Sequence, residues 1–321
     1  MVNTEVIQHA VSLLCEGELV VIPTETVYGL GADASNENAV KKIFKAKGRP
    51  QNHPLIVHIA NDNYLSNWAI DIPEIAYKLT KEFWPGPLTL VLKRAPHVSK
   101  VITGGQDTIA LRAPSHPITQ QILSMFKGGI AAPSANSFGY ISPTTIEHVK
   151  KDMGNKVSLI IDGGPCQVGI ESTIIDLSHD KPALLRPGML SHVMIEQVLG
   201  VSIDIAPQVT PRISGFLPSH YAPKTPTILV ESLSLPHFVK SRIKTLRLAV
   251  LARQPNQYIQ QISDYWLNWI TLPNAPKAYA NRLYKEMRKL DLLRYDAIIL
   301  ENVPDGVEWL AIRDRIKRAS A

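Results

Sequence analysis

The sequence is poor in cysteine and in charge for its length. Cys15 and Cys166 are the only cysteines among 321 residues, and 19% of the residues are charged. Two distant cysteines cannot form a disulfide framework, and no spacing of Cys and His is typical of zinc ligands. We expect Cys15 to lie in the core on an amphipathic helix and Cys166 to be an ordinary loop residue. A thiol nucleophile is therefore not expected.

Long apolar runs are also absent. No segment approaches the roughly 20 apolar residues that a membrane-spanning helix needs. The first residues lack the basic start and apolar stretch of a signal peptide. The hydrophobic fraction of 45% excludes a disordered chain. We expect a soluble cytoplasmic protein with no membrane contact.

Several well-known catalytic and nucleotide-binding motifs are missing. The sequence contains no GxxxxGK[ST] P-loop and no GxGxxG after a strand. It also contains no HExxH, no GxSxG and no kinase HRD or DFG motif. Any nucleotide chemistry must therefore use another arrangement of residues.

Short apolar strands alternate with helices up to residue 204, which predicts an α/β fold. The sheet should be mixed, because not every pair of strands has a helix between its members. Helices are predicted over 4–16, 36–47, 73–84, 117–127, 144–153 and 191–199. Strands are predicted over 19–22, 55–59, 88–92, 108–112, 129–132, 159–161, 172–177 and 183–185.

A proline-rich stretch marks a boundary after this region. Residues 205–226 hold five prolines and no helical or strand periodicity, which favours a semi-rigid linker. Strands and helices then alternate again over 227–321, which predicts a small βαβ-type unit. The expected organisation is a first domain over 1–204, the linker over 205–226 and a second domain over 227–321.

Positive charge is concentrated in the last third of the chain. Residues 1–206 hold 17 Lys and Arg against 19 Asp and Glu, whereas residues 207–321 hold 17 against 9. A basic surface of this kind permits contact with RNA, and a solvated basic face explains it equally well. The sequence leaves this alternative open.

Polar residues follow several apolar strands, where ligands bind in open α/β sheets. Thr24 and Thr26 come after the strand over 19–22. Lys47 and Arg49 flank Gly48 at a helix end, where the helix dipole favours cations and where they could also hold a polyphosphate. Each feature alone is a weak signal.

Arg112 ends an apolar strand, so its guanidinium needs an anionic partner from the protein or from a substrate. His58 lies inside an apolar strand, where a lone histidine is usually a core group. Ser134, Asn136 and Ser142 lie in the polar turn after the strand over 129–132. Ser172 opens the strand over 172–177, and Arg186 lies at the end of the next strand. Together these residues predict a cationic, hydroxyl-rich cleft for an anionic ligand.

A set of short motifs lies in order along residues 15–190: PTETVYGLG at 23–31, KAKGRP at 45–50, HPLIVHI at 53–59, PGPLTLVL at 85–92, RAP at 112–114, PSAN at 133–136, STIID at 172–176 and RPG at 186–188. This ordered set resembles the YrdC-like family, the L-threonylcarbamoyladenylate synthases. The segment HYAP at 220–223 and the basic last domain resemble the long form of these enzymes.

The resemblance implies a twisted mixed-sheet catalytic domain and a small Rossmann-like αβα second domain. It also implies that L-threonine, bicarbonate and ATP react to give threonylcarbamoyl-AMP, pyrophosphate and water. A separate threonylcarbamoyl transferase would then modify the adenosine after the anticodon of tRNA. Direct tRNA contact through the basic second domain is possible on this reading.

The resemblance also assigns site residues. Lys47 and Arg49 would be catalytic. The residues implied for ATP are Lys47, Arg49, His53, Thr108, Ser134, Asn136, Ser142, Arg186 and Tyr221. Those implied for L-threonine are Thr26, His58, Arg112, Ala132 and Ser172.

No protein nucleophile is required if the carbamate of threonine attacks the α-phosphorus. No carboxylate cluster suggests a fixed metal site, so Mg²⁺ is expected to arrive with ATP. Tyr221 would let the linker fold back as a lid that excludes water.

Two other functions compete with this interpretation. An RNA-binding module without synthase activity would use the basic last third of the chain. A relative that handles carbamoyl-adenylate, as in hydrogenase maturation, would carry fused acylphosphatase or zinc-finger segments, and the sequence has neither.

Overall fold

The computed structural model describes residues 4–205, 211–215, 217, 219–256 and 266–321. The chain forms two compact units. The first consists of Met1–Phe138 and Ser142–Phe216, and the second of Gly139–Ile141 and Leu217–Ala321. The division after residue 216 falls inside the proline-rich stretch. The second unit also takes three residues from the middle of the first unit's sequence.

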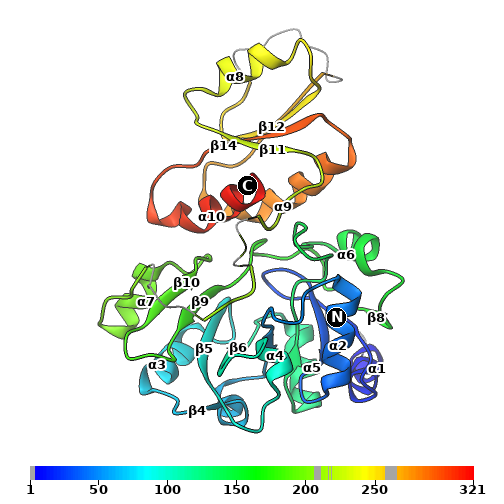
Figure 1. Cartoon of the computed structure of the whole chain (residues 1–321), viewed down its shortest axis with the longest axis vertical. Helices are drawn as coiled ribbons and strands as arrows, with labels where there is room; N and C mark the ends of the chain where they lie inside the picture. The colour runs from blue at the N-terminus through cyan, green and yellow to red at the C-terminus, as the bar shows by residue number, and fades with distance from the viewer. Residues whose placement is uncertain (1–3, 206–210, 216, 218, 257–265) are drawn as a thin grey trace. The chain divides into compact units, whose positions relative to one another are not determined.

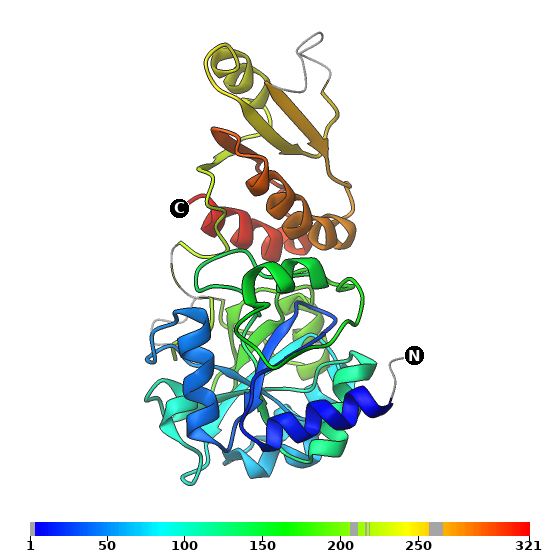
Figure 2. The same cartoon turned by 90° about the vertical axis from the view of Figure 1, so that its right-hand side faces the viewer.

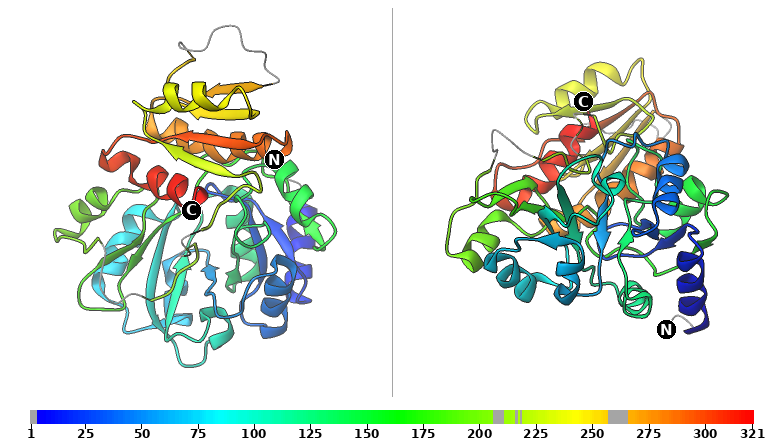
Figure 3. Two further views of the ribbon diagram at one scale, coloured as in Figure 1. Left: turned by 45° about the horizontal axis from the view of Figure 1, so that its top comes forward. Right: turned by 60° about the horizontal axis from the view of Figure 1, so that its bottom comes forward.

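A twisted mixed sheet forms the centre of the first unit, as predicted (Figures 1 and 3). Its strand order is β10-β9-β5-β6-β3-β7-β2-β1-β8, with β4 paired to β5. The pairs β3/β6, β5/β9 and β1/β8 are parallel, and the other pairs are antiparallel. The strands are β1 Val20–Ile22, β2 Gly29–Asp33, β3 Ile56–His58, β4 Ala69–Ile70, β5 Leu88–Arg94, β6 Thr108–Arg112, β7 Ile130–Ala131, β8 Leu159–Ile160, β9 Thr173–Asp176 and β10 Ala183–Arg186.

Helices surround this sheet close to the predicted positions. α1 and α5 pack side by side, and their apolar residues join those of β1 and β7 in one core cluster (Figures 1 and 2). The four-residue helix α4 and the 3-10 helix η1 were not predicted, because such short elements have no measurable periodicity. The helices are α1 Thr4–Cys15, α2 Glu37–Lys47, η1 Asp62–Asn67, α3 Glu74–Phe83, α4 Lys100–Thr103, α5 Pro117–Phe126, α6 Ile146–Met153 and α7 His192–Leu199.

The prediction that Cys15 lies in the core was wrong, because Cys15 is exposed. The buried face of α1 consists of Ile7, Ala10 and Leu14. Each residue of an α-helix is rotated about 100° from the one before it. Cys15 follows directly after Leu14, so it leaves the buried face at the last position of the helix.

The β1–β2 hairpin was also missed by the sequence reading. β2 begins with Gly29-Leu-Gly31, which reads as a turn rather than a strand. A Cβ atom at Gly31 would lie 2.9 Å from the carbonyl oxygen of Val20 on β1, so only glycine fits there. The six residues between the two strands form the connection that carries Thr24 and Thr26.

Local signals define both ends of α2. The side chain of Asn36 accepts hydrogen bonds from the backbone N–H groups of Asn38 and Ala39, at 3.0 and 3.1 Å. Gly48 ends the helix in the left-handed conformation, at a φ of 63°. Lys47 therefore occupies the last helical position, and Arg49 leaves the helix in a different direction.

A parallel four-stranded sheet with the order β11-β14-β12-β13 forms the second unit. α8 lies on one face of this sheet, and α9 and α10 lie on the other, as a Rossmann-like αβα unit predicts (Figure 1). No described helix in either unit is long and apolar enough to cross a membrane. The elements are β11 Thr227–Val230, α8 Leu235–Arg242, β12 Leu248–Ala252, β13 Leu267–Thr271, α9 Pro276–Leu292, β14 Ala297–Glu301, η2 Val307–Trp309 and α10 Leu310–Ala319.

Substitution Asn36→Ala should lower the free energy of unfolding of the first unit by about 1 kcal/mol, because two backbone donors of α2 lose their acceptor. Urea denaturation measures this change. Asn38→Ala is the matched control, since Asn38 is exposed in the first turn of the same helix. Equal losses for both variants would contradict the capping role of Asn36.

Candidate active site

A buried ion pair lies at the carboxyl end of β6. Nη2 of Arg112 is 2.7 Å from Oε1 of Glu25, and both side chains are almost fully buried. The guanidinium also donates to Oγ1 of Thr26 at 2.9 Å and to the carbonyl of Gly86 at 3.1 Å. The anion that Arg112 requires is thus supplied by the protein. The sequence reading missed Glu25, although an acidic residue between two threonines after a buried strand was an available signal.

His58 lies next to Arg112 in the parallel β3/β6 ladder. Burial, with a smaller contribution from the charge of Arg112, lowers the pKa of His58 to about 3, so the imidazole is neutral at ordinary pH. Its Nδ1 atom is buried and has no hydrogen-bond partner among the described residues. Such atoms are uncommon in folded proteins, so His58 is a candidate for contact with a ligand or with water.

The backbone of β7 completes this part of the site. Ala132 follows β7, and its N–H donates to the carbonyl of Ile56 at 3.0 Å. This bond brings Ala132 to β3, the strand that carries His58. Four of the five residues predicted for threonine are therefore held by adjoining strands and by the β1–β2 connection.

The fifth, Ser172, precedes β9 and interacts with Arg186 at the end of β10. Arg186 donates through Nη2 to Oγ of Ser172 and through Nε to its carbonyl, both at 3.1 Å. Oγ of Ser172 also shares a hydrogen bond of 2.7 Å with Oγ1 of Thr89. Ser172 and Arg186, which we predicted for different substrates, are thus direct neighbours.

Lys47 binds the turn that follows β7. Its Nζ donates to the backbone carbonyl of Ser134 and, at 2.6 Å, to that of Asn136. The N–H of Phe138 in turn donates to the carbonyl of Lys47 at 2.9 Å. At the far end of this turn, Oγ of Ser142 donates to the buried carboxylate of Glu171 at 2.6 Å.

Arg49 and His53 both lie against the ring of Phe138. The guanidinium carbon of Arg49 is 5.4 Å from the ring centre, and the ring of His53 meets it edge-on at 5.1 Å. Burial, together with the charges of Arg49 and Arg212, lowers the pKa of His53 below its usual value. His53 is therefore more easily kept neutral beside these cations.

A cavity also adjoins Lys47. Its volume is about 600 Å³, and one glutamate faces four lysines along its walls. The surface of this cavity is therefore positive. Its charged lining residues are Glu18, Lys42, Lys45, Lys47 and Lys156.

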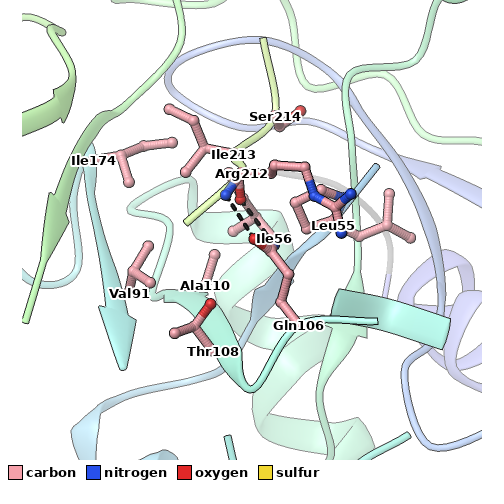
Figure 4. A pocket seen from close by; sticks show the side chains of 11 residues that line it. Leu55, Ile56, Val91, Gln106, Thr108, Ala110, Ile174, Arg212, Ile213 and Ser214 are labelled. Atoms are coloured by element: carbon pink, nitrogen blue, oxygen red, sulfur yellow. Dashed lines mark hydrogen bonds between the residues drawn. The ribbon is translucent and has the colours of Figure 1, made fainter. Parts of the chain in front are cut away.

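Linker residues 212–214 pack against Thr108 and its neighbours (Figure 4). Ile213 is buried against Ile56, Val91 and Ile174. On one side of it, Arg212 and Gln106 exchange hydrogen bonds of 2.6 and 3.0 Å, which Figure 4 shows as dashed lines.

Ser214 connects two of the predicted ATP residues. Its carbonyl accepts from Nη1 of Arg186 at 3.0 Å, and its hydroxyl accepts from Nη2 of Arg49 at 3.4 Å. In the linker, the HYAP segment at 220–223 was predicted to matter, whereas Ile213 and Ser214 were not. A serine next to an isoleucine in a proline-rich stretch gives no signal of this role.

Tyr221 is the one predicted site residue that belongs to the second unit. It has a positive φ of 61°, and its side chain is buried. Its ring lies 4.2 Å from that of His220 and stacks on Tyr284 at 5.9 Å. The other predicted site residues all belong to the first unit.

Cys166 is buried, and the charges of Glu25 and Arg112 act on its thiol. Burial is the main cause that raises the pKa of Cys166 to about 12, so this thiol stays protonated. No group of three or more His, Cys, Asp and Glu side chains in the described ranges could hold a metal ion.

Two family models cover almost the whole chain. Residues 12–188 match the Sua5/YciO/YrdC model, which carries the description Telomere recombination. Residues 190–321 match a model described as Threonylcarbamoyl-AMP synthase, C-terminal domain.

Several known proteins are similar to this chain over nearly its full length. The chain is 43% identical to Threonylcarbamoyl-AMP synthase of Pyrococcus abyssi, covering 98% of this chain and 94% of that protein. It is 40% identical to the Bacillus subtilis protein of the same name, with coverage of 99% and 94%. The crystal structure of P. abyssi Sua5 complexed with L-threonine superimposes with a TM-score of 0.90 at 40% identity, covering 98% of this chain and 94% of that one. The chain therefore belongs to the Sua5/YciO/YrdC family, in the long form that carries the additional C-terminal domain.

Proposed function

We propose that this chain is a threonylcarbamoyl-AMP synthase, which transfers the adenylyl group of ATP to N-carboxy-L-threonine. The observation that carries the proposal is the buried group of Arg112, Thr26 and neutral His58, found in a chain whose full-length relatives bear that name. A P. abyssi relative has been solved with L-threonine. The product would supply a threonylcarbamoyl transferase that modifies tRNA.

Threonine binding is derived from the donors around Arg112. A guanidinium has five N–H groups, and Glu25, Thr26 and Gly86 engage three different nitrogens of it. The remaining N–H groups are suited to the threonine carboxylate. Glu25 fixes the guanidinium and balances its charge, so the site accepts a net neutral amino acid. Thr26, Ser172 and Nδ1 of His58 would supply neutral polar contacts to threonine.

ATP binding is assigned to the cationic residues near the turn after β7. Lys47, Arg49 and Arg186 would meet the phosphates, and Ser134, Asn136 and Ser142 would contact the rest of the nucleotide. His53, Thr108 and Tyr221 complete the set expected from the resemblance. Ser214 offers neutral oxygen atoms to Arg49 and Arg186. Charged phosphate oxygens form stronger hydrogen bonds and would replace them.

The reaction then needs no covalent enzyme intermediate. The threonine amine combines with bicarbonate to give the carbamate and water. A carbamate oxygen attacks the α-phosphorus of ATP, and the bond to the bridging oxygen breaks, so pyrophosphate leaves with the electron pair. Lys47 and Arg49 stabilise the charge that develops on the phosphates.

Mg²⁺ is expected to come with ATP rather than to reside in the protein. The described residues offer no cage of acidic and histidine ligands, and phosphate oxygens with water suit this ion. Bound there, Mg²⁺ would neutralise part of the phosphate charge. The cytoplasmic location and the contact with tRNA stay predictions from the sequence.

The rival function is an RNA-binding module without turnover. The basic last third of the chain supports it, with 17 Lys and Arg against 9 Asp and Glu over residues 207–321. It predicts RNA affinity with a steep salt dependence and no consumption of ATP. It gives no reason for the buried Arg112 group in the first unit.

Pyrophosphate release by the purified protein tests the proposal. Release should require ATP, L-threonine and bicarbonate together, and omission of any one should abolish it. Lys47→Ala and Arg49→Ala should each lower kcat by about 100-fold, the usual effect of losing a preorganised charge donor. Lys151→Ala, at an exposed position of α6, is the control. Release without threonine or bicarbonate, or no release at all, would reject the function.

Threonine affinity tests the ion pair. Glu25→Gln should weaken L-threonine binding about tenfold, because Arg112 loses the buried carboxylate that fixes it. Isothermal titration calorimetry measures the Kd. Glu18→Gln is the matched control, since Glu18 pairs with Lys42 on the surface. Unchanged affinity in folded Glu25→Gln protein would show that the pair does not position Arg112.

The pH dependence of threonine binding tests the state of His58. Because its pKa is lowered to about 3, the imidazole stays neutral as pH falls through the ordinary histidine value of about 6.5. The Kd for L-threonine should therefore vary less than about twofold between about pH 5.5 and 8. His58→Gln should bind more weakly with the same flat profile. An inflection near pH 6.5 that this variant loses would disprove a neutral His58.

A further inference from the structure

The second unit holds a three-residue segment that the sequence places inside the first. Gly139–Ile141 lies between Phe138 and Ser142 along the chain and belongs to the second unit. Tyr140 forms a parallel bridge with Ala222, whose N–H donates to the carbonyl of Gly139 at 3.1 Å. The segment is therefore paired with the backbone after Tyr221.

Helix α9 binds the side chain of Tyr140. The Tyr140 hydroxyl donates to Oδ2 of Asp291 at 2.6 Å, and the N–H of Thr225 donates to Oδ1 of the same carboxylate at 2.7 Å. Burial acts to raise the pKa of Asp291, but these hydrogen bonds outweigh it and hold the pKa below its usual value. The carboxylate is thus ionised and satisfied on both oxygens.

Arg288 binds the same segment one helical turn earlier. Its side chain is buried, and its Nη2 donates to the carbonyl of Ile141. Its guanidinium carbon lies 4.7 Å from the ring centre of Tyr140. Arg288 and Asp291 are three residues apart and share one face of α9. Tyr284, four residues before Arg288, stacks on Tyr221.

The first unit holds the two sides of the same turn. Lys47 binds the carbonyls of Ser134 and Asn136 before the segment. After it, Ser142 donates to Glu171, and the N–H of Tyr28 donates to the carbonyl of the next residue, Pro143, at 2.9 Å. Five residues, 137–141, separate Asn136 from Ser142, and three of them are the segment that α9 binds. A displacement of this segment would therefore pass along a short stretch of backbone to Asn136 and Ser142.

We propose that Arg288 and Asp291 of α9 are positioning residues for ATP, acting through Gly139–Ile141 on the turn that carries Ser134, Asn136 and Ser142. This inference rests on the proposed function, which assigns that turn to the nucleotide. Three of the five residues assigned to threonine, Thr26, His58 and Arg112, lie on other elements. Loss of the α9 contacts should therefore weaken ATP binding and leave threonine binding unchanged.

The test compares the affinities for MgATP and for L-threonine, measured separately by calorimetry on the full chain. Arg288→Met and Asp291→Asn should each raise the Kd for MgATP about tenfold, as expected for losing a charge-assisted hydrogen bond. Tyr140→Phe removes a single hydroxyl and should raise it less. The Kd for L-threonine should stay within about twofold of the wild-type value. Arg288→Lys, which keeps a donor but not the planar fork, should recover part of the loss.

Arg282→Met is the matched control, because Arg282 lies on the same helix and pairs with Glu286 at a half-exposed position. Tyr140→Phe serves as the second variant if Arg288→Met does not fold. Equal MgATP affinity of wild type, Tyr140→Phe and Asp291→Asn would overturn the inference. Equal losses of MgATP and L-threonine affinity would also overturn it, because they would indicate a general disturbance of the fold. Failure of the synthase itself would appear in the wild type, as absent pyrophosphate release.

Discussion

The ion pair between Arg112 and Glu25 is the constraint on which the first unit depends. An unpaired guanidinium at the end of a buried strand would cost several kcal/mol. Glu25 satisfies it, and Oε2 of the same carboxylate accepts from the N–H of Ser115 at 3.1 Å. The pair therefore joins the β1–β2 connection, the end of β6 and the start of α5. The surroundings of Thr26 and His58 follow from this junction.

Much of the first unit could be predicted because local chemistry determined it. Asn36 and Gly48 bound α2, and continuous apolar runs gave most strands of the sheet. β2 could not be found in this way, because the need for Gly31 arises from a neighbouring strand rather than from its own sequence. The identity of the partner of Arg112 was open for the same reason. Both are decided by residues far away in the chain.

The candidate site shows the same limit. Motif order pointed to Lys47, Arg112 and Ser172, and the structure places each in a hydrogen-bonded group. Ser214 was not predictable, since its role depends on a single backbone carbonyl and a hydroxyl meeting two arginines. Side-chain type carries no information about a carbonyl contact. Linker residues of this kind become visible only in three dimensions.

Because Gly139–Ile141 belongs to the second unit, the chain passes between the two units three times rather than once. Deletion of residues 227–321 would therefore not remove an independent domain. It would leave Tyr140 and the carbonyl of Ile141 without Asp291 and Arg288. A C-terminal domain from another relative would have to supply the same two contacts to this turn.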